Sequence, residues 1–117
     1  MKAMFWNAPS FNGDVSNLDL SHCKNMRSMF NGATSFNHPS ISTWNPFNVT
    51  IMKWMFNAAD SFNRPIENWD VSSVEDMSSM FKQNSFNQPL DRWNTSSLTL
   101  MNELFYENPV FNQPLNN

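Results

Sequence analysis

The sequence predicts an α/β solenoid, a right-handed coil with one short parallel strand and one short helix in each repeat of about 25 residues. Two dipeptides recur at this interval. Met-Phe begins at residues 4, 29, 55 and 80 and is continued by Leu104-Phe105, whereas Phe-Asn begins at residues 11, 36, 62, 86 and 111. Tryptophan forms a third column at residues 44, 69 and 93. Self-similarity at a period of roughly 20–50 residues is typical of repeat architectures.

The chain is expected to form one domain over its 117 residues. The predicted repeats are approximately 1–25, 26–51, 52–76, 77–100 and a partial repeat at 101–117. Hydrophobic residues make up 40% of the chain, which argues against disorder and for a packed core. Stacked repeats need the same apolar side chain at the same place in every turn, so the Met, Phe and Trp columns are predicted to form that core.

The Met-Phe part of each repeat predicts a short helix. Its apolar residues are spaced i, i+3, i+6 and i+7, which is one face of a helix. Where the third repeat meets the fourth they are Val74, Met77, Met80 and Phe81. Similar spacings recur within 23–33 and 49–59. Ser72 and Glu75 predict a capping box, in which a serine hydroxyl and a glutamate satisfy free amides at the helix start.

The tryptophan part of each repeat predicts a short strand. In Trp69-Asp70-Val71, the apolar, polar, apolar order places two side chains inward and one outward. A proline after four of the five Phe-Asn pairs favours an extended entry into this strand. These prolines are Pro39, Pro65, Pro89 and Pro114. The order Ile/Leu-x-x-Trp-x-Val/Leu/Thr resembles the L-x-x-L-x-L strand signature of leucine-rich repeats, so a leucine-rich-repeat-like coil is expected.

The best copy of the repeat runs from Met55 to Met77 and reads MFNAADSFNRPIENWDVSSVEDM. It resembles the repeat of the BspA-like surface proteins, the mycoplasma-type lipoprotein repeat family. The resemblance covers essentially the whole chain, although Leu18 replaces Trp and Asn45-Pro46-Phe47 replaces Asp-Val-Ser. It implies a cell-surface or extracellular location, with a virion as a further alternative, and a role in adhesion. It implies no catalytic residues.

Composition and motifs argue against several function classes. The net charge is -3 and the Lys and Arg residues form no basic run, which argues against nucleic-acid binding. No apolar run approaches the ~18 residues that predict a membrane span, so this segment is not expected to insert into a membrane. The single cysteine, Cys23, excludes an internal disulfide. No phosphate loop, H-E-x-x-H or G-x-S-x-G motif is present, so we expect no enzyme, cofactor or metal site.

The outward positions of the predicted strands form the candidate binding row. Its members are Asn17, Asp19, Thr43, Asn45, Phe47, Asn68, Asp70, Arg92 and Asn94. On a curved solenoid this row would line the concave face, which is the usual recognition surface. Two alternatives stay open: the residues only cap turns and keep the surface soluble, or their oxygens hold a hard cation.

Asparagine follows phenylalanine in every repeat, at Asn12, Asn37, Asn63, Asn87 and Asn112. We predict a structural ladder in which each buried amide bonds to backbone in its own or the adjacent turn. The alternative is a row of exposed amides that bind a ligand. Asn48 and Asn94 also stand in N-glycosylation sequons, which matter only on a eukaryotic secretory route.

The predicted function is a non-catalytic surface adhesion or protein-binding module that uses the exposed strand face. Its partner is expected to be a protein or another surface ligand. The alternative is a structural subunit of an extracellular fibre, coat or virion. Neither end of the sequence shows the polar cap that solenoids carry, which predicts either head-to-tail self-association or a fragment of a longer array.

Overall fold

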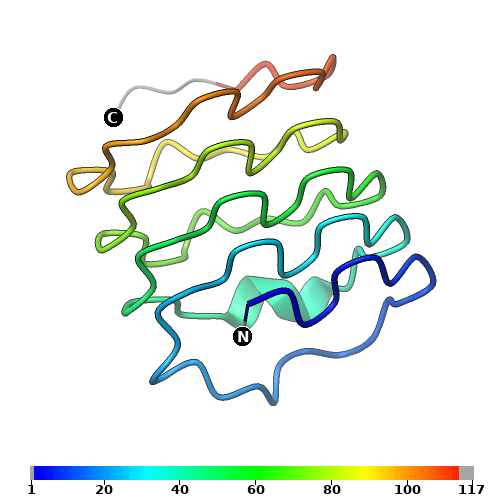
Figure 1. Ribbon diagram of the computed structural model, residues 1–117, viewed down its shortest axis with the longest axis horizontal. Coiled ribbons are helices and arrows are strands. Elements are labelled where there is room, and N and C mark those ends of the chain that lie inside the picture. The colour runs from blue at the N-terminus through cyan, green and yellow to red at the C-terminus, as the bar shows by residue number, and fades with distance from the viewer. Residues whose placement is uncertain (1, 114–117) are drawn as a thin grey trace.

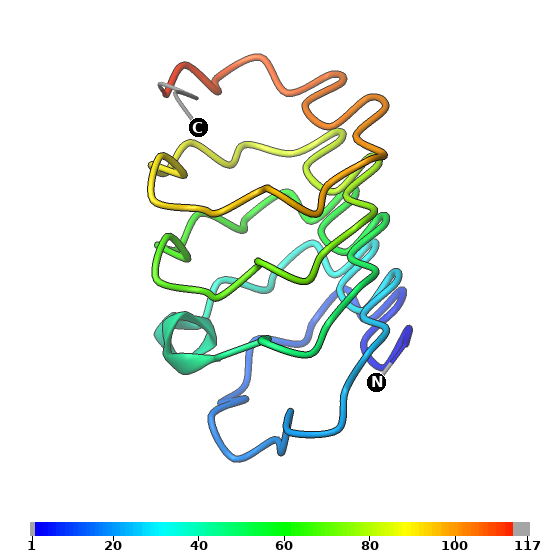
Figure 2. The ribbon, with the colours of Figure 1, turned by 90° about the vertical axis from the view of Figure 1, so that its left-hand side faces the viewer.

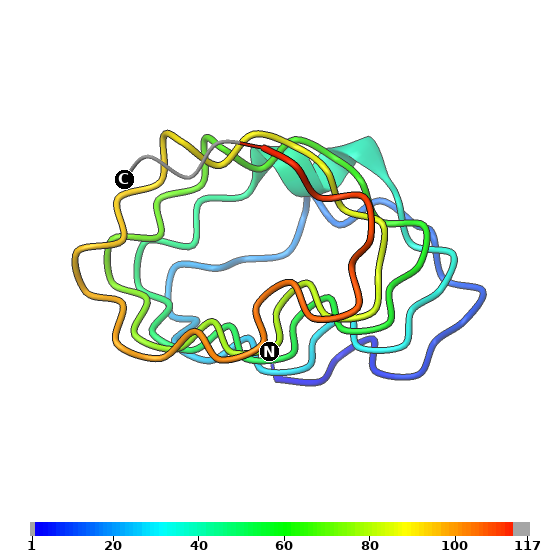
Figure 3. The same ribbon diagram turned by 90° about the horizontal axis from the view of Figure 1, so that it is seen from above.

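The chain winds around the molecule in stacked turns. The computed structural model describes residues 2–113, so Met1, Pro114 and the last residues of the partial fifth repeat lie outside the described part. The first turn lies at one end of the stack and residues 101–113 lie at the other (Figures 1 and 2). Seen from above, successive turns overlie one another around a common interior (Figure 3).

Two kinds of backbone hydrogen bond alternate in the segment 26–33. The N–H groups of residues 29, 31 and 33 donate to the carbonyls three residues back and so close tight turns. The N–H groups of residues 28, 30 and 32 donate instead to the carbonyls of residues 53, 55 and 57 in the next turn, at 2.8–2.9 Å. The same alternation occurs in segments 2–8, 52–59 and 77–84, and the tight turns occur again in segment 101–108. Together these segments form what we call the tight-turn wall. It comprises residues 2–8, 26–33, 52–59, 77–84 and 101–108, whose tight turns lie above one another (Figure 2).

The predicted helices at 23–33, 49–59 and 74–81 are wrong. An α-helix needs φ near −60° at every residue and bonds from each N–H to the carbonyl four residues back. Each tight-turn segment instead has two residues with positive φ, four positions apart. They are Ala3, Asn7, Ser28, Gly32, Trp54, Ala58, Ser79, Gln83, Glu103 and Glu107. These reversals turn alternate N–H groups toward the neighbouring turn, where they find their acceptors.

The predicted strands and sheet are also wrong, and with them the α/β solenoid and the leucine-rich-repeat-like coil. Residues 2–113 contain one helix, the 3-10 helix η1 (Pro39–Thr43), and only isolated bridges in place of strands. The parallel bridges pair Asn25 with Ile51, Ile51 with Asp76, and Asp76 with Leu100. They lie at the entry to the tight turns. At Trp69 the backbone N–H donates to the Ile66 carbonyl at 3.0 Å, so this segment bends where a strand was expected.

The helix η1 lies where the second repeat carries one extra residue. Pro39 opens it, because the fixed φ of proline suits the first helical position. His38 caps it by accepting from the Ser40 N–H at Nδ1, 3.1 Å away. The Ser40 hydroxyl also accepts from the Val15 N–H of the preceding turn at 2.9 Å. The extra residue is thus absorbed at the surface, while Ile41 and Trp44 stay buried.

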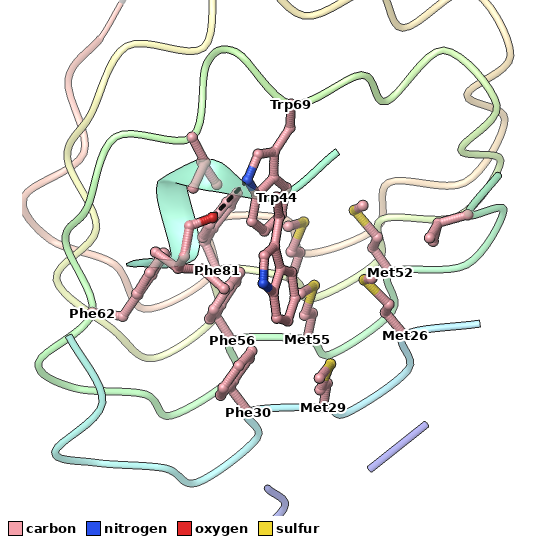
Figure 4. Packing of buried hydrophobic residues seen from close by; sticks show 14 of the residues in the cluster. Met26, Met29, Phe30, Trp44, Met52, Met55, Phe56, Phe62, Trp69 and Phe81 are labelled. Carbon is pink, nitrogen blue, oxygen red and sulfur yellow. Dashed lines mark hydrogen bonds between the residues drawn. The ribbon is translucent and has the colours of Figure 1, made fainter. Parts of the chain in front are cut away.

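The Met, Phe and Trp columns of the interior turns are buried, which confirms the predicted core (Figure 4). Phenylalanine rings stack both within and between turns. Within a turn, the ring centroids of Phe56 and Phe62 lie 3.9 Å apart. Between turns, those of Phe30 and Phe56 lie 5.4 Å apart and those of Phe56 and Phe81 lie 6.0 Å apart. Such ring pairs contribute about 0.5–1.5 kcal/mol beyond the area they bury.

The buried tryptophans join neighbouring turns through their indole N–H groups. Trp69 Nε1 donates to the Ile41 carbonyl at 3.0 Å (Figure 4). Trp44 Nε1 donates to the Val15 carbonyl at 2.9 Å, and Trp93 Nε1 donates to the Ile66 carbonyl at 2.9 Å. A buried carbonyl without a partner would cost about 1–3 kcal/mol. On this side of the molecule the indole N–H groups donate to the carbonyls of the neighbouring turn, as backbone N–H groups do in the tight-turn wall.

Candidate functional site

All nine residues of the candidate binding row are exposed. They lie on the tryptophan side of the molecule, where their buried neighbours Trp44, Trp69 and Trp93 point into the core. Because the described residues on this side form no sheet, the row is presented by successive bends of the chain and not by strands. The structure therefore leaves these side chains accessible to a partner, but on a different scaffold from the predicted one.

Three members of the row also hold the local backbone. Asp19 Oδ1 accepts from the Ser21 N–H at 2.9 Å, and Asn94 Oδ1 accepts from the Ser96 N–H at 3.1 Å. Asp70 Oδ1 accepts from both the N–H and the hydroxyl of Ser72, at 3.0 and 2.6 Å. The predicted capping box at Ser72 is therefore wrong: Ser72 donates to Asp70, and no α-helix begins there among the described residues. For these three residues, the contacts correspond to the alternative in which the row caps turns.

Hydrogen bonding shifts the ionisation of the two carboxylates. The pKa of Asp70 is lowered from its usual 3.8, first by the Ser72 hydroxyl and then by the Ser72 N–H. The pKa of Asp19 is lowered mainly by the backbone N–H and the side chain of Ser21. Both groups stay ionised in mildly acidic solution because their charged forms accept these bonds.

Four members of the row gather around one surface hollow. Asp19, Thr43, Asn45 and Phe47 line it together with Leu18, Trp44 and neighbouring residues of the first two turns. Phe47 is 42% exposed, which is unusual for a phenylalanine in a chain whose other rings mostly stack inside. The hollow thus combines one accessible aromatic ring with a polar surround.

The rest of the row lies elsewhere. Arg92 and Asn94 line a separate, open depression together with Asp91, Thr95 and Ser96. Asn17, Asn68 and Asp70 line neither of these two hollows. The structure therefore divides the predicted row into a patch around Phe47 and a set of isolated exposed polar residues.

The five asparagines after phenylalanine are linked in series. Asn12 Oδ1 accepts from the Asn37 N–H at 2.8 Å, and Asn37 Oδ1 accepts from the Asn63 N–H at 2.9 Å. Asn63 Oδ1 then accepts from Asn87 N–H at 2.9 Å, and Asn87 Oδ1 from Asn112 N–H at 3.2 Å. The side chains are exposed or half-buried, not buried as expected. The oxygens of the first four asparagines accept bonds within the molecule and so join each turn to the next.

Other chemistry-bearing side chains do not converge. Within residues 2–113, no three His, Cys, Asp or Glu side chains are grouped as metal ligands would be. Cys23 is buried, and His38 Nδ1 caps η1. The described residues also include no helix with the length and apolarity of a membrane span.

The sequence did not reveal a second surface group on the tight-turn wall. Lys2, Arg27 and Lys53 each stand three residues before the Phe of a Met-Phe pair, and stacking places them on consecutive turns. The Arg27 guanidinium and the Lys53 ammonium each lie 4.8 Å from the ring centroid of Trp54. These cations are about 25 residues apart along the chain, so only an alignment of the repeats shows that they share one position.

A family model described as "Mycoplasma protein of unknown function, DUF285" matches residues 1–83 and again residues 39–117, so the two matches together span the chain. No curated protein and no solved structure matches it. The chain therefore belongs to the DUF285 family of Mycoplasma proteins of unknown function.

Proposed function

We propose that this chain is a non-catalytic surface adhesion or protein-binding module, and that the hollow around Phe47 is its contact site. The observation that carries the proposal is the exposure of Phe47 beside Asp19, Thr43 and Asn45. Binding energy at protein interfaces concentrates in a few aromatic or Arg anchors surrounded by polar groups that exclude water. Phe47 is such an anchor, and the three polar side chains form part of its rim.

The backbone that carries Phe47 is held from several sides. The Val49 N–H donates to the Pro46 carbonyl at 3.0 Å, and Asn48 Nδ2 donates to the Ser21 carbonyl at 2.7 Å. Trp44 and Val49, on either side, are buried in the core. A surface ordered before binding loses less conformational entropy on association, so this hollow is prepared for a partner.

The family resemblance supports the same function. The Met55–Met77 repeat resembles those of BspA-like surface proteins, which favours a location at the cell surface, in the extracellular space or on a virion. The partner proposed here is a protein or another surface ligand, and neither nucleic acid nor membrane insertion is part of the proposal.

The test is a binding screen against purified host cell-surface and extracellular-matrix proteins, read by surface plasmon resonance. For any partner found, Phe47→Ser should weaken binding by at least tenfold, which corresponds to about 1.4 kcal/mol. Tyr106→Ser is the matched control, because Tyr106 is 51% exposed and lies in the last turn, far along the chain from Phe47. Equal binding by the Phe47→Ser variant and the parent protein would exclude this hollow as the site.

A second candidate is a structural subunit of an extracellular fibre, coat or virion, supported by complementary backbone groups at the two edges of the stack. Interior N–H groups such as those of Ser28 and Phe30 donate to the next turn. Within residues 2–113, the equivalent N–H groups of Glu103 and Phe105 have no backbone acceptor, and the Lys2 and Met4 carbonyls have no backbone donor.

Unpaired edges of this kind can template pairing with another copy, and a head-to-tail contact that does not close would build a filament. Sedimentation across a concentration series tests this candidate. Growth without a fixed stoichiometry would support it, and a monomer at every concentration would argue against it.

A further inference from the structure

A hollow on the tight-turn wall is lined by cations and tryptophans and is separate from the Phe47 patch. Its lining includes Lys2, Trp6, Arg27, Asn31 and Trp54, from the first three turns. The backbone of these turns is held in register, because the Ala3 N–H donates to the Arg27 carbonyl and the Ser28 N–H to the Lys53 carbonyl, both at 2.9 Å. The three cationic positions are therefore stacked one turn apart.

The positive charge of this column has no acidic neighbour within its own segments. Residues 2–8, 26–33 and 52–59 contain Lys2, Arg27 and Lys53 and neither Asp nor Glu. The acids of the tight-turn wall lie at its other edge, where Glu103 pairs with Lys82 at 3.4 Å and Glu107 accepts from Gln83 at 2.8 Å. The hollow is thus a cationic region on a protein whose net charge is -3.

Trp54 arranges two of the cations. Arg27 and Lys53 each lie 4.8 Å from the centre of its ring, so two long and otherwise mobile side chains are held against one indole. Trp54 has a φ of 59°. The equivalent positions of the other turns are occupied by Ala3, Ser28, Ser79 and Glu103. A bulky side chain is unusual in this backbone region. The core does not require it, because this indole is only half-buried.

Trp6 supplies an open aromatic face. It is 58% exposed, at the rim of the hollow. Among residues 2–113, the indole N–H groups of Trp6 and Trp54 donate to no protein acceptor, unlike those of the three buried tryptophans. The hollow therefore offers one flat ring for stacking, unused N–H donors, the amide of Asn31 and two nearby cations.

We infer that this hollow binds an acidic saccharide, a sugar that carries a carboxylate. Its carboxylate would accept charge-assisted hydrogen bonds from Arg27 and Lys2, which are stronger than bonds between neutral groups. The apolar face of the sugar ring would pack on Trp6, and the hydroxyls would bond to Asn31 and the indole N–H groups.

Two observations favour a short sugar over a nucleic acid. The cationic column ends after three turns, since Ser78 and Asn102 follow at the equivalent positions. Single-stranded nucleic acid needs a succession of aromatic platforms along a basic groove. Here only Trp6 is open, because Trp54 is engaged by Arg27 and Lys53.

The probes for the test are sialyllactose and glucuronic acid, compared with neutral lactose and glucose and with an oligothymidylate. Binding is followed by NMR shifts of the indole N–H groups and by calorimetry at low salt. We expect the acidic sugars to bind at least tenfold more tightly than their neutral counterparts, to shift the Trp6 signal, and to lose affinity in 0.5 M salt. Equal affinity for lactose, tighter binding of the oligothymidylate, or no binding of either acidic sugar would overturn the inference.

Two variants and one control locate the site. Arg27→Gln should reduce affinity for sialyllactose at least tenfold, and Trp6→Ala should do the same while leaving the unfolding midpoint unchanged, because Trp6 is exposed. Lys82→Gln is the control, since Lys82 belongs to the same wall but pairs with Glu103. Equal losses in the Lys82→Gln and Arg27→Gln variants would show a general charge effect and refute the site. The outcome is independent of the Phe47 patch, whose variant Phe47→Ser should bind these sugars normally.

Discussion

The side-chain oxygen of Asn37 accepts a hydrogen bond from the backbone N–H of Asn63, 2.9 Å away in the following turn. Asn63 repeats the contact with the N–H of Asn87 at 2.9 Å. The Phe-Asn segments thus join their turns through a side-chain oxygen, whereas the tight-turn wall joins them through backbone carbonyls. Every turn must repeat the asparagine because each one is the acceptor for the next.

Replacing Asn37 by alanine should therefore reduce the free energy of unfolding. The Asn63 N–H would lose its acceptor, and one intramolecular hydrogen bond contributes about 0.5–1.5 kcal/mol. We expect a loss of about 1 kcal/mol in urea denaturation. Asn37→Asp keeps an oxygen at the same place and should retain most of the stability. An unchanged midpoint for Asn37→Ala would contradict a structural role for the ladder.

Truncation of a stacked phenylalanine should have a larger effect. Phe56 is fully buried and contacts the rings of Phe62, Phe30 and Phe81. Phe56→Ala should cost about 3–5 kcal/mol, the usual range for a buried aromatic ring. Phe47→Ala, at an exposed ring, should stay within about 0.5 kcal/mol of the parent protein. Similar losses for the two variants in urea denaturation would contradict the assigned core.

The core could be predicted from the sequence, but the secondary structure could not. The spacing of Val74, Met77, Met80 and Phe81 fits one face of a helix, yet it fits two successive tight turns equally well. The deciding feature is the positive φ at Ser79 and Gln83, and both residues are ordinary in a helix. The hydrogen bonds to the next turn stabilise this backbone, and they form only when the neighbouring turn is in place.

The candidate sites show the same limit. Periodicity identified exposed positions such as Asp19 and Asp70, because residues flanking a core column tend to face outward. It could not show that their oxygens bond to Ser21 and Ser72. It also did not reveal the cluster at Trp54, because Arg27 and Lys53 meet only through the stacking of turns.

The stability of the protein should depend on pH through Asp70. The pKa of this carboxyl is lowered from 3.8 in the folded state by its bonds to Ser72. A lowered folded-state pKa gives a contribution that is present above about pH 3.8 and is lost as the pH falls through the folded pKa. The urea midpoint of the parent protein should therefore fall on acidification across this range.

Asp70→Asn isolates this effect. An asparagine keeps an oxygen that accepts from the serine N–H, as Asn94 does from Ser96 at 3.1 Å, but it does not titrate. The variant should keep its fold at neutral pH and show a flatter dependence of the urea midpoint on pH below about 4. A slope as steep as that of the parent protein would show that the Asp70 carboxylate does not contribute to the pH dependence of stability.

The left-handed positions predict opposite effects for two adjacent alanines. Ala58 has a φ of 56°, a conformation that costs an L-residue about 1–2 kcal/mol, whereas Ala59 is fully buried and is not in this region. Ala58→Gly should stabilise the protein by about 0.5 kcal/mol, because relief of that strain exceeds the entropic penalty of glycine, about 0.5–1 kcal/mol. Ala59→Gly pays the same penalty without relief and also loses a buried methyl group, so it should destabilise by more than about 1 kcal/mol.

The reverse substitution tests the same argument in another turn. Gly32 has a φ of 75°, and a Cβ there would lie 2.7 Å from Asn7 Oδ1. Gly32→Ala should therefore lower the free energy of unfolding by about 1 kcal/mol, measured by urea denaturation. The Asn7 side chain can move aside to make room for the Cβ, but the strain of an alanine at positive φ would remain. The predictions for Ala58 and Gly32 both rest on the positive φ at these positions. If Ala58→Gly lost as much stability as Ala59→Gly, the backbone described for the tight-turn wall would be contradicted.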